Sequence, residues 1–73
     1  MAAYQGYRSW NAWNVALWIF NDGATYNYGH DLCRKHGKAK AARIFAREMY
    51  DQRTPDGAKY TLASIREAFA GMN

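Results

Sequence analysis

The sequence has a single cysteine, Cys33, among 73 residues. An intramolecular disulfide is therefore excluded, and a reducing compartment fits this cysteine count best. The longest strongly apolar run, residues 15–20, is far shorter than the roughly 20 residues that cross a bilayer. Residues 1–10 lack the basic start and continuous apolar core of a signal peptide. We therefore expect a soluble, cytoplasmic protein with no membrane partner.

Motifs for catalysis and for cofactors are also missing. The sequence has no nucleophile elbow, no phosphate-binding glycine loop and no pair of carboxylates in a catalytic pattern. His30, Cys33 and His36 repeat every three residues, but this spacing turns successive side chains by about 60° around a helix. They do not readily converge on one metal ion. A fold this small also leaves little room for a ligand pocket of about 300–1,000 Å³. We expect a protein that is not an enzyme and holds no metal or cofactor.

Aromatic residues, by contrast, are abundant at 16% of the chain, and the hydrophobic content of 49% argues against disorder. A chain of this length buries only about 60% of the surface that its unfolded form exposes. Each buried aromatic ring removes about 150–250 Å² from water, so rings are an efficient way to build a small core. We predict a single small helical domain, residues 1–73, in which residues 1–8 form an extended N-terminal arm.

All three tryptophans lie in residues 9–22, SWNAWNVALWIFND. Ser9 is a good N-cap for a helix, and the segment does not alternate as a strand would. At about 100° per residue, one narrow stripe of this helix holds Asn11, Asn14, Trp18, Asn21 and Asp22. The remaining two-thirds is apolar, which is wider than a surface helix needs. We predict that this broad side faces the core. Its largest members are Trp10, Trp13, Leu17 and Phe20.

Three more helices are predicted at about residues 24–36, 38–51 and 62–70, with Gly37 and the turn 53–57 between them. Gly29 lies inside the second of these, where glycine costs about 1 kcal/mol relative to alanine. We infer that a large neighbour approaches it closely. Tyr28 and Leu62 are among the residues predicted to face inward. The fold class is therefore all-α, a compact bundle of about four short helices packed around the aromatic-rich helix 9–22.

Basic residues are concentrated in residues 34–47, and the chain has a net charge of +4. The run contains Arg34, Lys35, Lys38, Lys40, Arg43 and Arg47 and no acidic residue. Clustered cations bind phosphates by releasing counterions from a polyanion. A solvated face that keeps the protein soluble is the simpler interpretation, and no helix-turn-helix or zinc-finger signature is present. The run supports the hypothesis of a nucleic-acid-binding accessory protein that uses this basic surface.

The stripe with Trp18 also has two interpretations. A tryptophan surrounded by Asn11, Asn14 and Asn21 suits a partner-binding surface, because tryptophan is enriched in interface hot spots. Alternatively, the N-terminal arm or the segment near Tyr60 covers Trp18, and the asparagines bond to that backbone. Both remain open at the level of sequence.

Residues 9–22 also resemble the motif W-N-V-A/S-L-W-I-x-N-D near the start of small domains of unknown function from bacteriophages, plasmids and other mobile elements. The YQGY arm and the later TPDGAKYTLASIREAFAGM are similar to the same family. The positions that match the motif are Trp13, Asn14, Val15, Ala16, Leu17, Trp18, Ile19, Asn21 and Asp22. The resemblance carries no known activity, cofactor or catalytic residue.

The resemblance implies an origin in a mobile element, and small phage proteins often bind and inhibit a host protein. Our first hypothesis is therefore a non-enzymatic phage-type protein, in the host cytoplasm, that binds a host protein and inhibits a host defence or another host process. The second is the nucleic-acid-binding accessory protein. The third is a self-associating domain, in which a second copy covers the broad apolar side of the helix 9–22.

Overall fold

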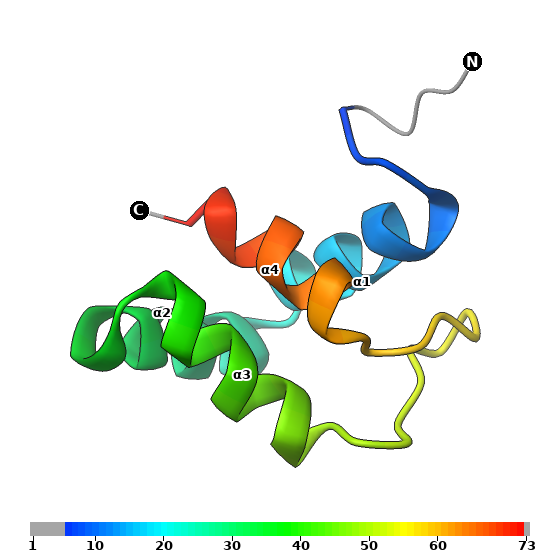
Figure 1. Cartoon of the computed structure of the whole chain (residues 1–73). Helices are drawn as coiled ribbons and strands as arrows, with labels where there is room; N and C mark the ends of the chain where they lie inside the picture. Colours follow the sequence, from blue (N-terminus) through cyan, green and yellow to red (C-terminus); the bar gives the residue numbers. More distant parts are fainter. Residues whose placement is uncertain (1–5, 73) are drawn as a thin grey trace.

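The computed structural model describes residues 6–72, and these residues form four helices (Figure 1). The helices are α1 (Trp10–Asn21), α2 (Gly23–His36), α3 (Lys38–Glu48) and α4 (Leu62–Ala70). The predicted all-α class is thus confirmed. Most of the predicted N-terminal arm, residues 1–5, lies outside the described residues.

Short polar caps set the ends of the helices. Ser9 caps α1 as predicted, its hydroxyl accepting the amide of Ala12 at 3.1 Å. Asp22 alone separates α1 from α2, and its carboxylate accepts the amide of Thr25 at 2.9 Å. Gly37 alone joins α2 to α3, with φ of 82°, a conformation that favours glycine. One-residue connections leave these three helices little freedom to change their mutual directions.

The end of α3 differs from the prediction, whereas the start of α4 agrees with it. Helix α3 ends at Glu48 rather than near residue 51, because the chain turns over residues 49–51 and reaches a φ of 64° at Asp51. Helix α4 begins at Leu62 as predicted, and the hydroxyl of Thr61 caps it by accepting the amide of Ser64 at 3.1 Å.

The core lies where all four helices meet. Helix α1 packs on α4, α2 packs on α3, and α3 also packs on α4, an arrangement visible in Figure 1. Phe45 of α3 and Phe69 of α4 are the largest fully buried side chains, and their ring centroids lie 5.3 Å apart in an edge-on contact. Such aromatic pairs add about 0.5–1.5 kcal/mol beyond the burial of their area.

The inward side of α1 is narrower than the predicted broad side, which also included Ala12, Val15, Ala16 and Ile19. Trp10 is 41% exposed and Phe20 is 37% exposed, so the prediction that they build the core is wrong. Trp13 and Leu17 are half-buried. The buried apolar residues of α1 are instead smaller ones, Ala12, Val15, Ala16 and Ile19. Small side chains allow close approach of α4, which explains why the helix buries this narrower side.

Gly29 shows the close approach that the sequence predicts. A Cβ atom at this position would lie 3.1 Å from Cε1 of Phe69 and 3.2 Å from Cε of Met72. The predicted inward orientation of Tyr28 and Leu62 is wrong, because both are exposed. Tyr28 lies at the rim of the core, where its hydroxyl donates to Oε1 of Glu48. Leu62 lies in the first turn of α4 and projects beyond the core.

Candidate functional site

The asparagine stripe of α1 is covered by the chain's own loop between α3 and α4. Asn14 is 1% exposed, and its Nδ2 donates to Oδ2 of Asp56 at 2.9 Å. Its Oδ1 accepts the hydroxyl of Thr54 at 2.6 Å. The indole nitrogen of Trp18 donates to the same Asp56 oxygen at 2.9 Å. One carboxylate therefore binds two side chains of α1.

Asn11 holds the other end of the same loop. Its Nδ2 donates to the carbonyl of Lys59 and to Oγ of Ser64, both at 2.8 Å. Its Oδ1 accepts the amide of Lys59 at 2.9 Å. The amide side chain thus bonds both backbone groups of one loop residue, as a neighbouring strand would.

Residues 53–59 form a small turn structure of their own, which we name the loop hairpin. Arg53 and Lys59 form an antiparallel bridge. The amide of Thr54 donates to the carbonyl of Ala58 at 2.8 Å, and the hydroxyl of Thr54 accepts the amide of Ala58 at 3.0 Å. Gly57 has a φ of 98°, which other residues rarely adopt. The loop hairpin is therefore preformed where it meets α1.

The electrostatics of this contact favour an ionised Asp56. The hydrogen bonds from Asn14 and Trp18 lower the pKa of the Asp56 carboxyl, and burial opposes them only weakly. Donors that bind the charged form of a carboxylate stabilise that form. The loop hairpin is thus attached to α1 by charge-assisted hydrogen bonds.

These contacts place three of the four partner-binding candidates inside the fold. Asn11, Asn14 and Trp18 all bond to the loop hairpin or its edge, and Trp18 is half-buried. Asn21 is exposed at the end of α1. The segment that covers Trp18 is the one before Tyr60, which was one of the alternatives open at the level of sequence.

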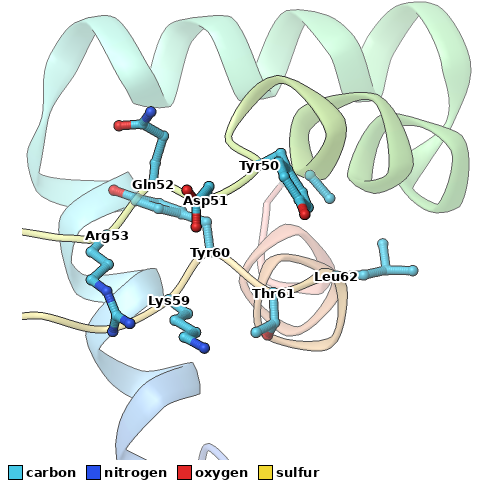
Figure 2. A pocket seen from close by; sticks show the side chains of 9 residues that line it. Tyr50, Asp51, Gln52, Arg53, Lys59, Tyr60, Thr61 and Leu62 are labelled. Carbon is cyan, nitrogen blue, oxygen red and sulfur yellow. The ribbon is translucent and has the colours of Figure 1, made fainter.

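An open hollow of about 370 Å³ lies between the end of α3, the loop hairpin and the start of α4 (Figure 2). It is lined by Ala46, Tyr50, Asp51, Gln52, Arg53, Lys59, Tyr60, Thr61 and Leu62. The volume lies at the lower end of the range of ligand sites, but the hollow is open to solvent rather than enclosed. Sequence reasoning missed this site, although two tyrosines and a leucine in a turn region are a signal that points to it.

The hollow combines apolar and charged groups. Tyr50 is 81% exposed, and Figure 2 shows it with Leu62 on the side opposite Arg53 and Lys59. The guanidinium of Arg53 donates to the carbonyl of Gly57 at 3.1 Å, which fixes that cation on the loop hairpin. The surface therefore offers two apolar groups beside two positive charges, and one carboxylate, that of Asp51, also lines it.

Tyr60 forms the inner wall of the hollow. Its ring centroid lies 6.2 Å from that of Phe45, so it connects the hollow to the core. Burial raises the pKa of the Tyr60 hydroxyl, and the charge of Asp22 adds to this effect. The hydroxyl is therefore protonated at neutral pH and available as a hydrogen-bond donor.

The predicted basic residues are all exposed, but they do not form one cluster. Lys40, Arg43 and Arg47 follow one face of α3 at spacings of three and four. Arg34 and Lys35 lie in the last turn of α2. Lys38 donates from Nζ to the carbonyl of Ala70 at 3.1 Å and so caps the C-terminal end of α4.

Two further findings apply to residues 6–72 only. No group of three His, Cys, Asp or Glu side chains among them is placed to hold a metal ion. No helix that they form is long and apolar enough to cross a membrane.

Burial raises the pKa of the Cys33 thiol, and the nearby charge of Lys38 only partly offsets this rise.

The fold defines a small all-α domain whose candidate site is an open, partly cationic hollow rather than an enclosed catalytic pocket. The chain belongs to a family of unknown function (DUF7249), whose sequence profile matches residues 1–71. Comparison with curated proteins and with solved structures gives no match. The family match agrees with the resemblance to a domain of unknown function.

Proposed function

We propose that this chain is a non-enzymatic protein of a phage or another mobile element that acts by binding a host protein. The resemblance of its α1 motif to mobile-element domains supports the origin. The observation that carries the binding role is the open hollow, with Tyr50 and Leu62 exposed beside Arg53 and Lys59. Inhibition of a host defence or another host process is the consequence that we propose for such binding.

The chemistry of the hollow indicates the kind of host segment that fits. Tyrosine and arginine are enriched among the residues that dominate binding energy. Arg53 and Lys59 attract acidic groups, and the net charge of +4 steers an acidic partner toward the molecule. The expected partner presents an apolar side chain next to a carboxylate.

Capture from host lysate with site-specific variants tests this proposal. A protein that the wild type enriches should be lost with Tyr50→Ala and with Lys59→Glu, because each removes one half of the hollow's chemistry. Lys35→Glu is the matched control, since Lys35 is exposed on α2 and lies outside the hollow. Equal capture by all four proteins would contradict the assignment of the hollow as the binding site.

A nucleic-acid-binding accessory role is the alternative, and the basic face of α3 favours it. Lys40, Arg43 and Arg47 are exposed on one side of that helix. A gel shift across a salt series tests it. The logarithm of the observed binding constant should fall linearly with the logarithm of the salt concentration, with a slope of about −0.9 for each phosphate neutralised. The double variant Arg43→Glu/Arg47→Glu should abolish binding, and absence of wild-type binding at low salt would remove this alternative.

A further inference from the structure

The loop hairpin has two edges, and both present backbone groups. Arg53 and Lys59 pair with each other across the hairpin. The hydrogen bonds beside this pair join the residues that flank it, from the amide of Thr54 to the carbonyl of Ala58 at 2.8 Å and from the amide of Tyr60 to the carbonyl of Gln52 at 3.4 Å. In an antiparallel pair of this kind, the amides and carbonyls of the two paired residues point outward. Each edge of the hairpin therefore offers one amide and one carbonyl.

The fold closes only one of these edges. On the Lys59 edge, Oδ1 of Asn11 accepts the amide at 2.9 Å and Nδ2 of Asn11 donates to the carbonyl at 2.8 Å. On the Arg53 edge, no hydrogen bond within residues 6–72 uses the amide or the carbonyl. Backbone groups that pair with no protein atom must reach water, because burying them unpaired is costly. The Arg53 edge is therefore open.

We propose that the host segment binds as an extended strand along the Arg53 edge, an inference that rests on the proposed function of the hollow. One residue of the segment donates its amide to the carbonyl of Arg53 and accepts the amide of Arg53, as the Asn11 side chain does for Lys59. In strand addition of this kind, backbone hydrogen bonds provide affinity and side chains provide specificity. A helical partner uses its own amides and carbonyls internally along its length, so it has none to offer to this edge.

The neighbours of Arg53 limit the pairing to one residue. Pro55 has no N–H, so it cannot continue the row of donors. Asp51 has a φ of 64°, which departs from the extended backbone of a strand. The host segment thus gains two backbone hydrogen bonds at this edge, and its side chains must supply the rest of the affinity.

The side chains of the host segment follow the alternation of a strand. The residue that pairs with Arg53 places its side chain on the same face as that of Arg53, and residues two positions away share this face. Arg53 and Lys59 both line the hollow, so this is the face of the hollow. Figure 2 shows Tyr50 and Leu62 across the hollow from Arg53.

This alternation determines the spacing of the groups that the partner presents. A carboxylate on the paired residue meets the guanidinium of Arg53, which has five N–H donors and uses one nitrogen to bond Gly57. An apolar side chain two positions away lies about 7 Å further along the strand and points into the hollow. The partner is therefore an extended segment with an acidic and an apolar residue two positions apart.

A synthetic pentapeptide, acetyl-Leu-Thr-Glu-Thr-Leu-amide, tests this assignment. Its central glutamate is the residue that pairs with Arg53, and its leucines share the face of the glutamate whichever way the chain runs. Titration into the isotope-labelled wild-type protein should shift the amide resonance of Arg53 in the NMR spectrum. At a peptide concentration of about ten times Kd, hydrogen exchange of this amide should slow by about tenfold.

Two control peptides separate backbone bonding from charge and composition. Acetyl-Thr-Leu-Glu-Leu-Thr-amide has the same composition, but its leucines lie on the face opposite the glutamate. A form of the first peptide with a methyl group on the backbone nitrogen of the glutamate keeps every side chain but cannot donate to the carbonyl of Arg53. Each control should bind more weakly than the first peptide by about tenfold or more.

Three results would overturn the extended mode of binding. They are no binding of the first peptide at millimolar concentration, equal binding of all three peptides, and an unchanged exchange rate of the Arg53 amide while the first peptide binds. Lysate capture is a separate readout. Capture that depends on Tyr50 and Lys59 while the peptide fails would remove only the extended mode. Peptide pairing at Arg53 supports the open edge, and with no capture that depends on those two residues it would remove the proposed function alone.

Discussion

Asn14 is a polar residue that stands between two apolar residues, Trp13 and Val15, in the motif of α1. It joins α1 to Asp56, which lies 42 positions further along the chain, and also accepts the hydroxyl of Thr54. No buried side-chain nitrogen or oxygen among the described residues lacks a hydrogen-bond partner. Because burial of an unbonded amide is costly, Asn14 makes the attachment of the loop hairpin a condition for folding α1 in this orientation.

Replacement of Asn14 measures this attachment. We expect Asn14→Ala to lower the free energy of unfolding by about 1–3 kcal/mol, because the buried hydroxyl of Thr54 loses its acceptor. Urea denaturation gives the value. Asn21→Ala is the matched control on the same helix, and it should change the unfolding free energy little because Asn21 is exposed.

The Asp56 carboxylate gives this contact a pH dependence. Its pKa is lowered in the folded state by Asn14 and Trp18, whereas an unfolded aspartate titrates at about 3.9. The stabilisation of the fold by ionised Asp56 is therefore complete above about pH 4. It is lost as the pH falls through the lower pKa that Asp56 has in the folded state. The melting temperature of Asp56→Asn should fall less than that of the wild type between about pH 4 and pH 2. If the melting temperatures of the two proteins fell equally with pH, Asp56 would not be the cause of the pH dependence.

At the scale of the elements, sequence pattern predicts where the helices lie better than how they face one another. Ser9, Gly37 and Thr61 predict helix ends because their effects are local. The inward side of α1 depends on which neighbour packs there, and the largest apolar side chains of the helix did not identify it. Ala12 and Ala16 allow α4 to approach, which a ranking by hydrophobic area does not predict.

Two substitutions on α1 that remove side chains of similar size should differ in their effect on the free energy of unfolding, because one lies on the buried side of the helix and the other does not. Ile19 is fully buried, so Ile19→Ala should lower the free energy of unfolding by about 2–5 kcal/mol. Leu17 is half-buried, and Leu17→Ala should cost about 1 kcal/mol. Chemical denaturation at low protein concentration measures both. Equal losses would contradict the orientation of the helix.

The contact at Gly29 predicts a loss of stability on adding side-chain volume. Gly29→Val should lower the free energy of unfolding by about 1–3 kcal/mol, because its side chain meets the buried ring of Phe69. Ala24→Val is a control at an exposed position of the same helix. A similar effect of both substitutions would contradict the contact, and helix propensity would not explain it, because valine is a better helix former than glycine but a worse one than alanine.

The hollow shows why a site on a loop escapes prediction from this sequence. Tyr50 and Tyr60 are visible as aromatic residues in a turn region, but their arrangement depends on the loop hairpin, which α1 holds in place. The bonds from Asn11 and Asn14 to that hairpin connect positions 48 and 42 residues apart. A local pattern identifies the residue types and leaves these long-range contacts undetermined.

At the scale of the whole molecule, the position of α1 in the chain bears on the order of folding. Although α1 also packs on α2, most of its contacts lie with the loop hairpin and with α4, so they close long loops, and contacts of high sequence separation form slowly. Helices α2 and α3 are joined by Gly37 alone and pack on each other, so they can associate early. During synthesis, α1 emerges before α4 and the loop hairpin, which cover it. Its tryptophans are therefore expected to stay exposed to chaperones until those segments have been made.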